Sequence, residues 1–301
     1  MKPCDNILQI QRFSVNDGEG IRSTVFFKGC RLRCRWCANP ESWSWTPQIM
    51  FYAHKCTSCG RCAAVCPSGA TQTDAFGRIH YSSALCATCG TCLKSCPHKA
   101  RVLLGHPLTV EEVLAEIKKD LVFYEESGGG VTFSGGEPFL HPVYLRQLLD
   151  ACAAWGISTA AESCGCFDWE ECSDLIPRLD QLFLDIKLMD AREHQRYTGQ
   201  DNTLILENIV RCSAANNNIV VRVPAIAGVN ATEESIGAMC HFLLEQTNIR
   251  HIELLPYHKL GYEKMQALGL HGELFATPSA QELAELTELI HSYGLTTVSY
   301  K

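Results

Sequence analysis

Three cysteines near the N-terminus have the spacing of a metal-binding loop. Cys30, Cys34 and Cys37 follow the pattern C-x3-C-x2-C and can supply three thiolates from one short segment. Iron–sulfur clusters are usually held by four cysteines, so three leave one iron without a protein ligand. An open metal position is where a substrate can bind. The spacing predicts an open-site four-iron cluster, and the alternative is a structural zinc site, which would need a fourth ligand nearby.

Eight further cysteines form two copies of the pattern C-x2-C-x2-C-x3-C-P. The copies comprise Cys56, Cys59, Cys62 and Cys66, and then Cys86, Cys89, Cys92 and Cys96. The segment resembles a two-cluster bacterial ferredoxin, in which the fourth cysteine of each run ligates the other cluster. That resemblance implies that Cys96 completes the first set and Cys66 the second. Two zinc knuckles or two empty loops are the alternatives.

Other residues suited to chemistry follow apolar runs in the rest of the chain. They are Gly135, Gly136, Glu137, Glu162, Ser163, Asp185, Lys187, Arg222 and His258. Paired glycines let a backbone approach a ligand closely, although they also form simple turns. Asp185 and Lys187 can face one pocket only where a strand ends, and otherwise form a surface ion pair. Arg222 can instead lie at the edge of the core with its head group in water.

The elements that must position these residues alternate between strand and helix. Apolar periodicity and turn residues predict strands at 23–29, 131–134, 158–162, 181–187, 219–224, 251–255 and 296–299. Periodicity and capping signals predict helices at 109–126, 142–155, 168–175, 202–215, 232–246 and 278–293. Such alternation predicts an α/β fold with parallel strands, and six or seven units favour a full or partial barrel. The residues suited to chemistry fall at the carboxyl ends of the strands, where barrel enzymes place their active sites.

Composition limits the class of protein. The 301 residues allow one large domain or two smaller ones, and the Cys- and Gly-rich segment 47–105 predicts a module inserted into a barrel of residues 1–46 and 106–301. A net charge of −7 argues against a nucleic-acid partner. No apolar run reaches about 18 residues, and residues 1–17 are polar, so we expect no membrane span and a cytoplasmic location. In that compartment 18 cysteines indicate metal binding rather than disulfides.

The three-cysteine loop after the first barrel strand, with Trp36 before its third cysteine, resembles the radical S-adenosylmethionine superfamily. A second segment is similar to the signature of glycyl-radical-enzyme activating enzymes, the pyruvate formate-lyase activase family. It runs from Asp17 through Gly18 and Glu19 to Arg22 and is followed by FFKGC, which ends at Cys30. The resemblance covers nearly the whole chain. Glu19 departs from it, because many members have proline there, which would alter a partner contact but not the cluster.

The resemblance implies a partial (β/α)6-type radical S-adenosylmethionine barrel and a set of site residues. The three cysteines would hold a catalytic [4Fe-4S] cluster, and the methionine part of S-adenosylmethionine would chelate its fourth iron. The implied cofactor contacts are Trp36, Gly135, Gly136, Glu137, Asp185, Lys187, Arg222 and His258. Glu162 and Ser163 stand where some relatives bind a monovalent cation. Asp17, Gly18 and Arg22 would touch the partner's glycine loop.

The implied activity is that of an activase with three [4Fe-4S] clusters. Flavodoxin or ferredoxin would donate an electron through the insert, and a 5′-deoxyadenosyl radical would abstract hydrogen from a glycine of a glycyl radical enzyme. One alternative is a radical S-adenosylmethionine enzyme acting on another peptide or small molecule, as maturases do, although these usually keep auxiliary clusters in a C-terminal extension. The other is a ferredoxin-type electron carrier, against which the roughly 200 residues beyond the insert argue.

Overall fold

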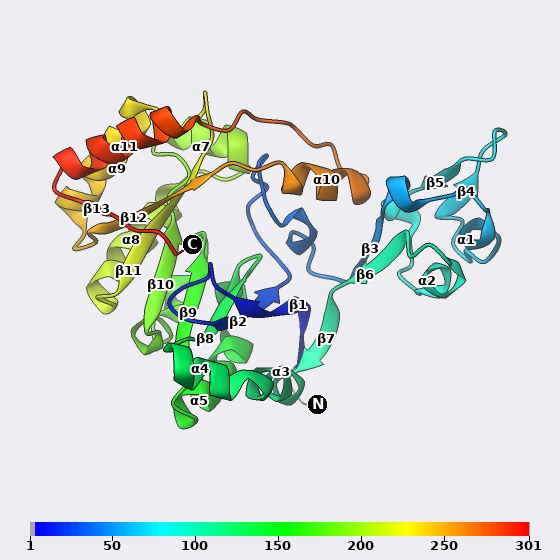
Figure 1. The fold of residues 1–301 in the computed structure, drawn as a ribbon, viewed down its shortest axis with the longest axis horizontal. Coiled ribbons are helices and arrows are strands. Elements are labelled where there is room, and N and C mark those ends of the chain that lie inside the picture. The colour runs from blue at the N-terminus through cyan, green and yellow to red at the C-terminus, as the bar shows by residue number, and fades with distance from the viewer. Residues whose placement is uncertain (1–3, 301) are drawn as a thin grey trace.

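The computed structural model describes residues 4–300 and consists of a nine-stranded sheet flanked by helices, with a small lobe on one side (Figure 1). Residues 1–3 and 301, the ends of the predicted barrel segments, lie outside the described residues. The strand order is β13-β12-β11-β10-β9-β8-β2-β1-β7. The bounds are β1 Cys4–Ser14, β2 Arg22–Phe27, β7 His106–Thr109, β8 Gly130–Gly135, β9 Ser158–Ser163, β10 Gln181–Asp185, β11 Ile219–Ala225, β12 His251–Pro256 and β13 Thr296–Thr297.

The middle of this sheet is parallel. Strands β2, β8, β9, β10, β11 and β12 pair in parallel, and the short β13 continues them at one edge. At the other edge β1 pairs antiparallel with β2, and β7 pairs antiparallel with β1. Six parallel strands joined by crossover helices confirm the predicted α/β fold and define a partial rather than a closed barrel.

The helices mostly follow the predicted segments. Their bounds are α3 Val110–Ile117, α4 Leu121–Ser127, α5 Pro142–Ala154, α6 Trp169–Cys172, α7 Ala191–Thr198, α8 Thr203–Ala215, α9 Glu233–Gln246, α10 Leu260–Ala267 and α11 Ala280–Ser292. The predicted capping box is present, because Thr109 and Glu112 exchange side chain-to-backbone hydrogen bonds at the start of α3. The sequence did not indicate β1, β7, α7 or α10.

The prediction of one helix over 109–126 was wrong. A 3-10 turn, η4 Lys118–Asp120, separates α3 from α4. Asp120 is completely buried, where it accepts hydrogen bonds from Ser23 Oγ at 2.8 Å and Arg12 Nε at 2.8 Å. These partners lie about one hundred positions away in the sequence, so the local pattern could not indicate the break.

The small lobe is built from residues 47–105, which follow the cysteine loop and precede β7. Its elements are β3 Gln48–Phe51, α1 Arg61–Ala64, β4 Thr71–Thr73, β5 Ile79–Tyr81, α2 Thr91–Ser95 and β6 Arg101–Leu104. Strands β3 and β6 pair antiparallel, so the chain enters and leaves the lobe side by side, with Gln48 opposite Leu104. Figure 1 shows the lobe projecting from the side of the barrel. In the described part of the chain, no helix is long and apolar enough to cross a membrane.

Candidate active site

A cavity of about 460 Å³ opens at the carboxyl ends of the parallel strands. That volume lies within the usual range for small-molecule sites. The predicted site residues that line it are Cys30, Cys34, Trp36, Cys37, Gly135, Gly136, Glu162, Ser163, Asp185, Lys187, Arg222 and His258. The barrel therefore brings together residues that span more than two hundred positions of the chain. Glu137 is the one predicted cofactor contact that is not among the residues lining this cavity.

The cysteine loop is held in place by backbone hydrogen bonds to neighbouring segments. Arg33 N donates to Thr198 O at 2.7 Å, and Arg35 N donates to Tyr197 O at 3.0 Å, which ties the loop to the end of α7. Burial raises the pKa of the Cys37 thiol to about 11 and also raises that of Cys34. Metal binding would therefore displace protons from both thiols. Three sulfur ligands on one wall of a large cavity fit a cluster with an open iron.

The two glycines at the end of β8, Gly135 as its last residue and Gly136 directly after it, allow the strand to end against the cysteine loop. Gly135 has a φ of 107°, and a Cβ on Gly136 would lie 2.1 Å from Gly29 O. Because neither glycine has a side chain, the two backbones come close enough to bond. Gly136 N donates to Phe27 O at 2.9 Å, and Glu137 N donates to Gly29 O at 2.8 Å. The pair therefore serves close packing of two backbones as well as lining the cavity.

Glu137 supports the cavity wall from behind. Its carboxylate is completely buried and accepts hydrogen bonds from Ser163 Oγ at 2.9 Å, Cys164 N at 2.8 Å and Cys164 Sγ at 3.0 Å. The expectation of a direct cofactor contact is corrected here, because these donors occupy the carboxylate. Cys164 is itself buried and also lines the cavity. Its hydrogen bond with Cys30 lowers the pKa of the Cys30 thiol.

Asp185 and Lys187 form an ion pair inside the cavity. Strand β10 ends at Asp185, and this lets both side chains line the same cavity, as the sequence required. Lys187 Nζ donates to Asp185 Oδ2 at 2.8 Å. Burial acts to lower the pKa of Lys187, but the Asp185 carboxylate and the nearby Cys34 and Cys164 together outweigh it and raise that pKa. The pair presents a fixed ammonium and a carboxylate beside the three cysteines.

Arg222 already has two acidic partners in this structure. Its guanidinium pairs with Glu162 and, through Nε at 2.8 Å, with Glu253, while it stacks 3.7 Å from the centre of the Phe183 ring. The alternative that Arg222 lies at the core edge with its head group in water was wrong, because the side chain is buried. Glu162 also accepts a hydrogen bond from Ser134. With the Glu162 charge paired to Arg222, these residues as placed do not fit the monovalent cation that the family resemblance implied.

The loop before β2 is anchored in the barrel at Gly18 and Arg22, while Val15, Asn16 and Glu19 are exposed. Arg22 is 2% exposed, and its guanidinium donates to Thr132 Oγ1 and to Val131 O, each at 2.7 Å. Asp17 Oδ2 accepts from Ser14 Oγ at 2.7 Å, and the adjacent Gly18 is buried. The expected surface contact by Arg22 is corrected, because Arg22 anchors this loop. The neighbouring Asn16, which the sequence did not single out, lines the cavity.

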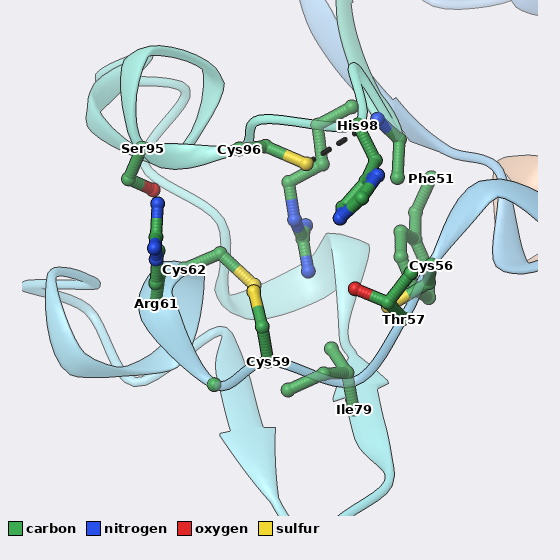
Figure 2. A pocket seen from close by; sticks show the side chains of 13 residues that line it. Phe51, Cys56, Thr57, Cys59, Arg61, Cys62, Ile79, Ser95, Cys96 and His98 are labelled. Carbon is green, nitrogen blue, oxygen red and sulfur yellow. Dashed lines mark hydrogen bonds between the residues drawn. The ribbon is translucent and has the colours of Figure 1, made fainter.

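A second pocket lies in the lobe and is lined by Cys56, Cys59, Cys62 and Cys96 (Figure 2). These are the four cysteines that the ferredoxin resemblance assigns to one cluster. Backbone amides approach their sulfurs, since Ser58 N lies 3.4 Å from Cys56 Sγ and Ala100 N lies 3.4 Å from Cys96 Sγ. The repeat reproduces the first contact, because Thr88 N lies 3.4 Å from Cys86 Sγ.

The two turns that place these amides are alike. Ser58 has a φ of 54° and Thr88 a φ of 51°, values that L side chains rarely adopt. The strained turn in each copy directs an amide at a cysteine sulfur, and such hydrogen bonds are typical of iron–sulfur sites. Among residues 4–300, no three or more Cys, His, Asp or Glu side chains converge closely enough to hold a single metal ion.

Comparisons with known proteins agree with this architecture. Residues 16–205 match the family model described as a 4Fe-4S single cluster domain. The chain is 39% identical to the trans-4-hydroxy-L-proline dehydratase activating enzyme of Clostridioides difficile, with 97% of each chain covered. It is 38% identical to the choline trimethylamine-lyase activating enzyme of Oleidesulfovibrio alaskensis, with 92% of this chain and 91% of the relative covered.

Among solved structures, a domain of pyruvate-formate lyase-activating enzyme from Bacteroides vulgatus is 34% identical. The match covers 57% of this chain and 98% of the solved domain, with a TM-score of 0.49. The parallel partial barrel with a three-cysteine loop at its mouth defines a radical S-adenosylmethionine enzyme. Within that class, the chain belongs to the glycyl-radical-enzyme activating enzymes. It is an oxidoreductase that uses a [4Fe-4S] cluster and S-adenosylmethionine to install a glycyl radical on a partner enzyme.

Proposed function

We propose that this activating enzyme holds three [4Fe-4S] clusters and that the two in the lobe deliver electrons to the catalytic one. The observation that carries the proposal is the pocket lined by Cys56, Cys59, Cys62 and Cys96, a complete set of four ligands. The second set would be Cys66, Cys86, Cys89 and Cys92. Fully ligated clusters have no open iron for a substrate, which suits them to electron transfer.

In the catalytic cavity, the three cysteines would hold the cluster whose open iron takes S-adenosylmethionine. Bound together, the cluster and S-adenosylmethionine supply the 5′-deoxyadenosyl radical. The Asp185–Lys187 pair would orient the polar groups of the cofactor, and His258 would contact its nucleoside, because all three line the cavity with the cysteines. Trp36 would cover the cluster. It packs against Tyr197 and Phe275, with ring centres 5.6 Å and 5.8 Å away.

The partner's glycine loop would reach this cavity past the segment before β2. Asn16 lines the cavity, and Asp17 and Gly18 follow it directly. Asp17→Ala should therefore leave uncoupled cleavage of S-adenosylmethionine largely intact while it reduces glycyl radical formation on the partner. Electron paramagnetic resonance quantifies that radical. A loss of uncoupled cleavage as complete as that of Cys34→Ala would place Asp17 in the cofactor site instead.

The electron donor would be a flavodoxin or a ferredoxin. The lobe, residues 47–105, carries six Lys and Arg against Asp74 alone, whereas the rest of the chain carries 20 Lys and Arg against 32 Asp and Glu. Charges of opposite sign steer the association of two proteins. Here the positively charged part of the molecule is the lobe, which also contains the two cysteine sets. An acidic one-electron carrier would accordingly dock on the lobe.

Metal content and product formation test the proposal together. The reconstituted protein should hold about 12 irons and no zinc, and Cys59→Ala or Cys30→Ala should each lower that to about 8. Cys30→Ala should also abolish 5′-deoxyadenosine formation with dithionite, whereas Cys59→Ala should retain it. About four irons in the wild-type protein would overturn the assignment of two clusters to the lobe. Cleavage of S-adenosylmethionine by Cys30→Ala would overturn the assignment of the catalytic cluster. A protein that binds iron but forms no 5′-deoxyadenosine would be an electron carrier.

A further inference from the structure

Arg101, the first residue of β6, is a buried cation without a hydrogen-bonded partner. Its side chain is 3% exposed, and none of its Nε, Nη1 and Nη2 atoms has a hydrogen-bond partner among the described residues. The guanidinium lies between two aromatic rings, 4.6 Å from the centre of Phe51 and 4.8 Å from that of Tyr81. Burying an unpaired charge is costly, so this arrangement requires a negatively charged group nearby.

The protein itself offers no such group in the lobe. Asp74 is the lobe's one acidic residue, and its carboxylate already binds Arg78 Nε at 2.8 Å and His80 Nε2 at 3.0 Å. Arg101 instead lines the pocket of Cys56, Cys59, Cys62 and Cys96. Tyr81, one of the two rings that flank the guanidinium, packs in one apolar cluster with Cys62, Cys86 and Cys92, which belong to both cysteine sets.

We infer that Arg101 is the internal counter-charge of the lobe's clusters and raises their reduction potentials. The inference rests on the proposed presence of those clusters. A [4Fe-4S] cluster with four thiolates is an anion in both redox states, and a one-electron reduction by the donor protein adds one further negative charge. A cation in a dry site stabilises the more negative state, and two flanking rings keep water from screening it.

Arg61 provides a matched control within the same pocket. It also lines the space between the cysteines, but it is exposed at the rim, and Figure 2 shows its side chain directed towards Ser95. Water and salt screen an exposed charge, so its effect on a cluster is small. The pair therefore compares a buried and an exposed guanidinium at one site.

The test measures the potential of the lobe's clusters, not activity. Wild-type protein, Arg101→Gln, Arg101→Lys and Arg61→Gln are each titrated with dithionite and followed by electron paramagnetic resonance, with a Cys30→Ala background to remove the catalytic cluster. Arg101→Gln should lower the ratio of reduced to oxidised cluster about tenfold at a fixed solution potential, a shift of about −59 mV for one electron. Arg101→Lys and Arg61→Gln should stay near the wild-type potential.

Each result decides the question. An unchanged potential in Arg101→Gln with its iron retained would overturn the inference, and so would an Arg101→Lys potential as low as that of Arg101→Gln. Loss of about four irons in both Arg101 variants would make the residue structural and also overturn it. Absence of the lobe's irons from the Cys30→Ala protein itself would instead reject the proposed clusters, so the two failures are distinguishable.

Discussion

Asp120 shows how one buried carboxylate connects three segments of the barrel wall. It is completely buried at the end of η4, where it accepts hydrogen bonds from Arg12 of β1 and Ser23 of β2. The hydrogen-bonded Arg12 guanidinium holds the pKa of this carboxyl below its usual range. Ionised Asp120 therefore stabilises the folded state.

The sign of the pH dependence follows from that shift. Because the pKa is lower in the folded protein than the value near 4 in the unfolded chain, the stabilisation is present above about pH 4 and is lost as the pH falls below it. Asp120→Asn should lower the urea midpoint at pH 7, and its deficit should shrink below pH 4. Asp174→Asn, at an exposed pair with Arg146, is the control and should change stability by under about 1 kcal/mol. A deficit independent of pH would contradict the account.

We expect Arg222 to contribute more to the stability of the fold than Asp120, because it neutralises two carboxylates at once. It is 6% exposed between Glu162 and Glu253, and Glu253 is 3% exposed. Arg222→Met should leave both carboxylates without their cation and destabilise the protein by about 3–5 kcal/mol, as measured by urea unfolding. The double variant Arg222→Met with Glu253→Gln should recover part of that loss. No recovery would mean that packing on Phe183, rather than charge, is what Arg222 contributes.

At the scale of elements, α10 connects the catalytic loop to the lobe (Figure 1). Gly261 lies so close to the cysteine loop that a Cβ there would be 1.9 Å from Cys37 O. One turn on, Lys264 Nζ binds Glu41 Oε1 at 2.6 Å and Asn39 Oδ1 at 2.8 Å. The end of the helix packs Leu268 against Met50 of β3. A single short helix thus contacts the cysteine loop at Cys37 and the first strand of the lobe.

Gly261→Ala should push α10 away from Cys37 because the added methyl group has no space. We expect a stability loss of about 1–3 kcal/mol from overpacking and a lower yield of 5′-deoxyadenosine with dithionite. Gln266→Ala, at an exposed position of the same helix, should change neither quantity. Wild-type yield in Gly261→Ala would show that the cysteine loop tolerates movement of α10.

At the scale of the whole molecule, charge is divided between two parts. The lobe has a net charge of +5, counting Lys and Arg against Asp, while the rest of the chain has −12. The exposed lobe cations include Lys55, Lys94 and Lys99, and two candidate ligands, Cys59 and Cys89, are also exposed. The positive surface therefore coincides with the place where an electron would enter.

The combined variant Lys55→Glu, Lys94→Glu and Lys99→Glu should slow reduction by a flavodoxin of negative net charge at least tenfold at low salt. The difference should shrink as ionic strength rises, since screening removes the steering. Stopped-flow absorbance measures the rate, and dithionite, which needs no protein docking, tests cluster integrity. Arg192→Glu, an exposed change on the barrel, is the control. If activation of the partner with dithionite fell instead, the lobe would be a docking surface for the glycyl radical enzyme.

The sequence by itself determined the cysteine spacings and the order of the barrel units. Cysteine spacing and strand–helix alternation are local properties, so the loop at Cys30, the repeats beginning at Cys56 and Cys86, and the parallel sheet were all predictable from neighbouring residues. The capping box at Thr109 belongs to the same group, because both of its partners lie within one helical turn.

Only the tertiary structure decided which charged side chains are buried and which groups they contact. Glu137 faces Ser163 and Cys164 instead of the cavity, and Arg22 is held inside the barrel by Thr132. Arg101 is buried with no hydrogen-bond partner among the described residues. Each outcome depends on contacts between segments that are far apart along the chain. The burial that turns a charged side chain into an anchor or a counter-charge is a property of the packed molecule, and local sequence pattern does not contain it.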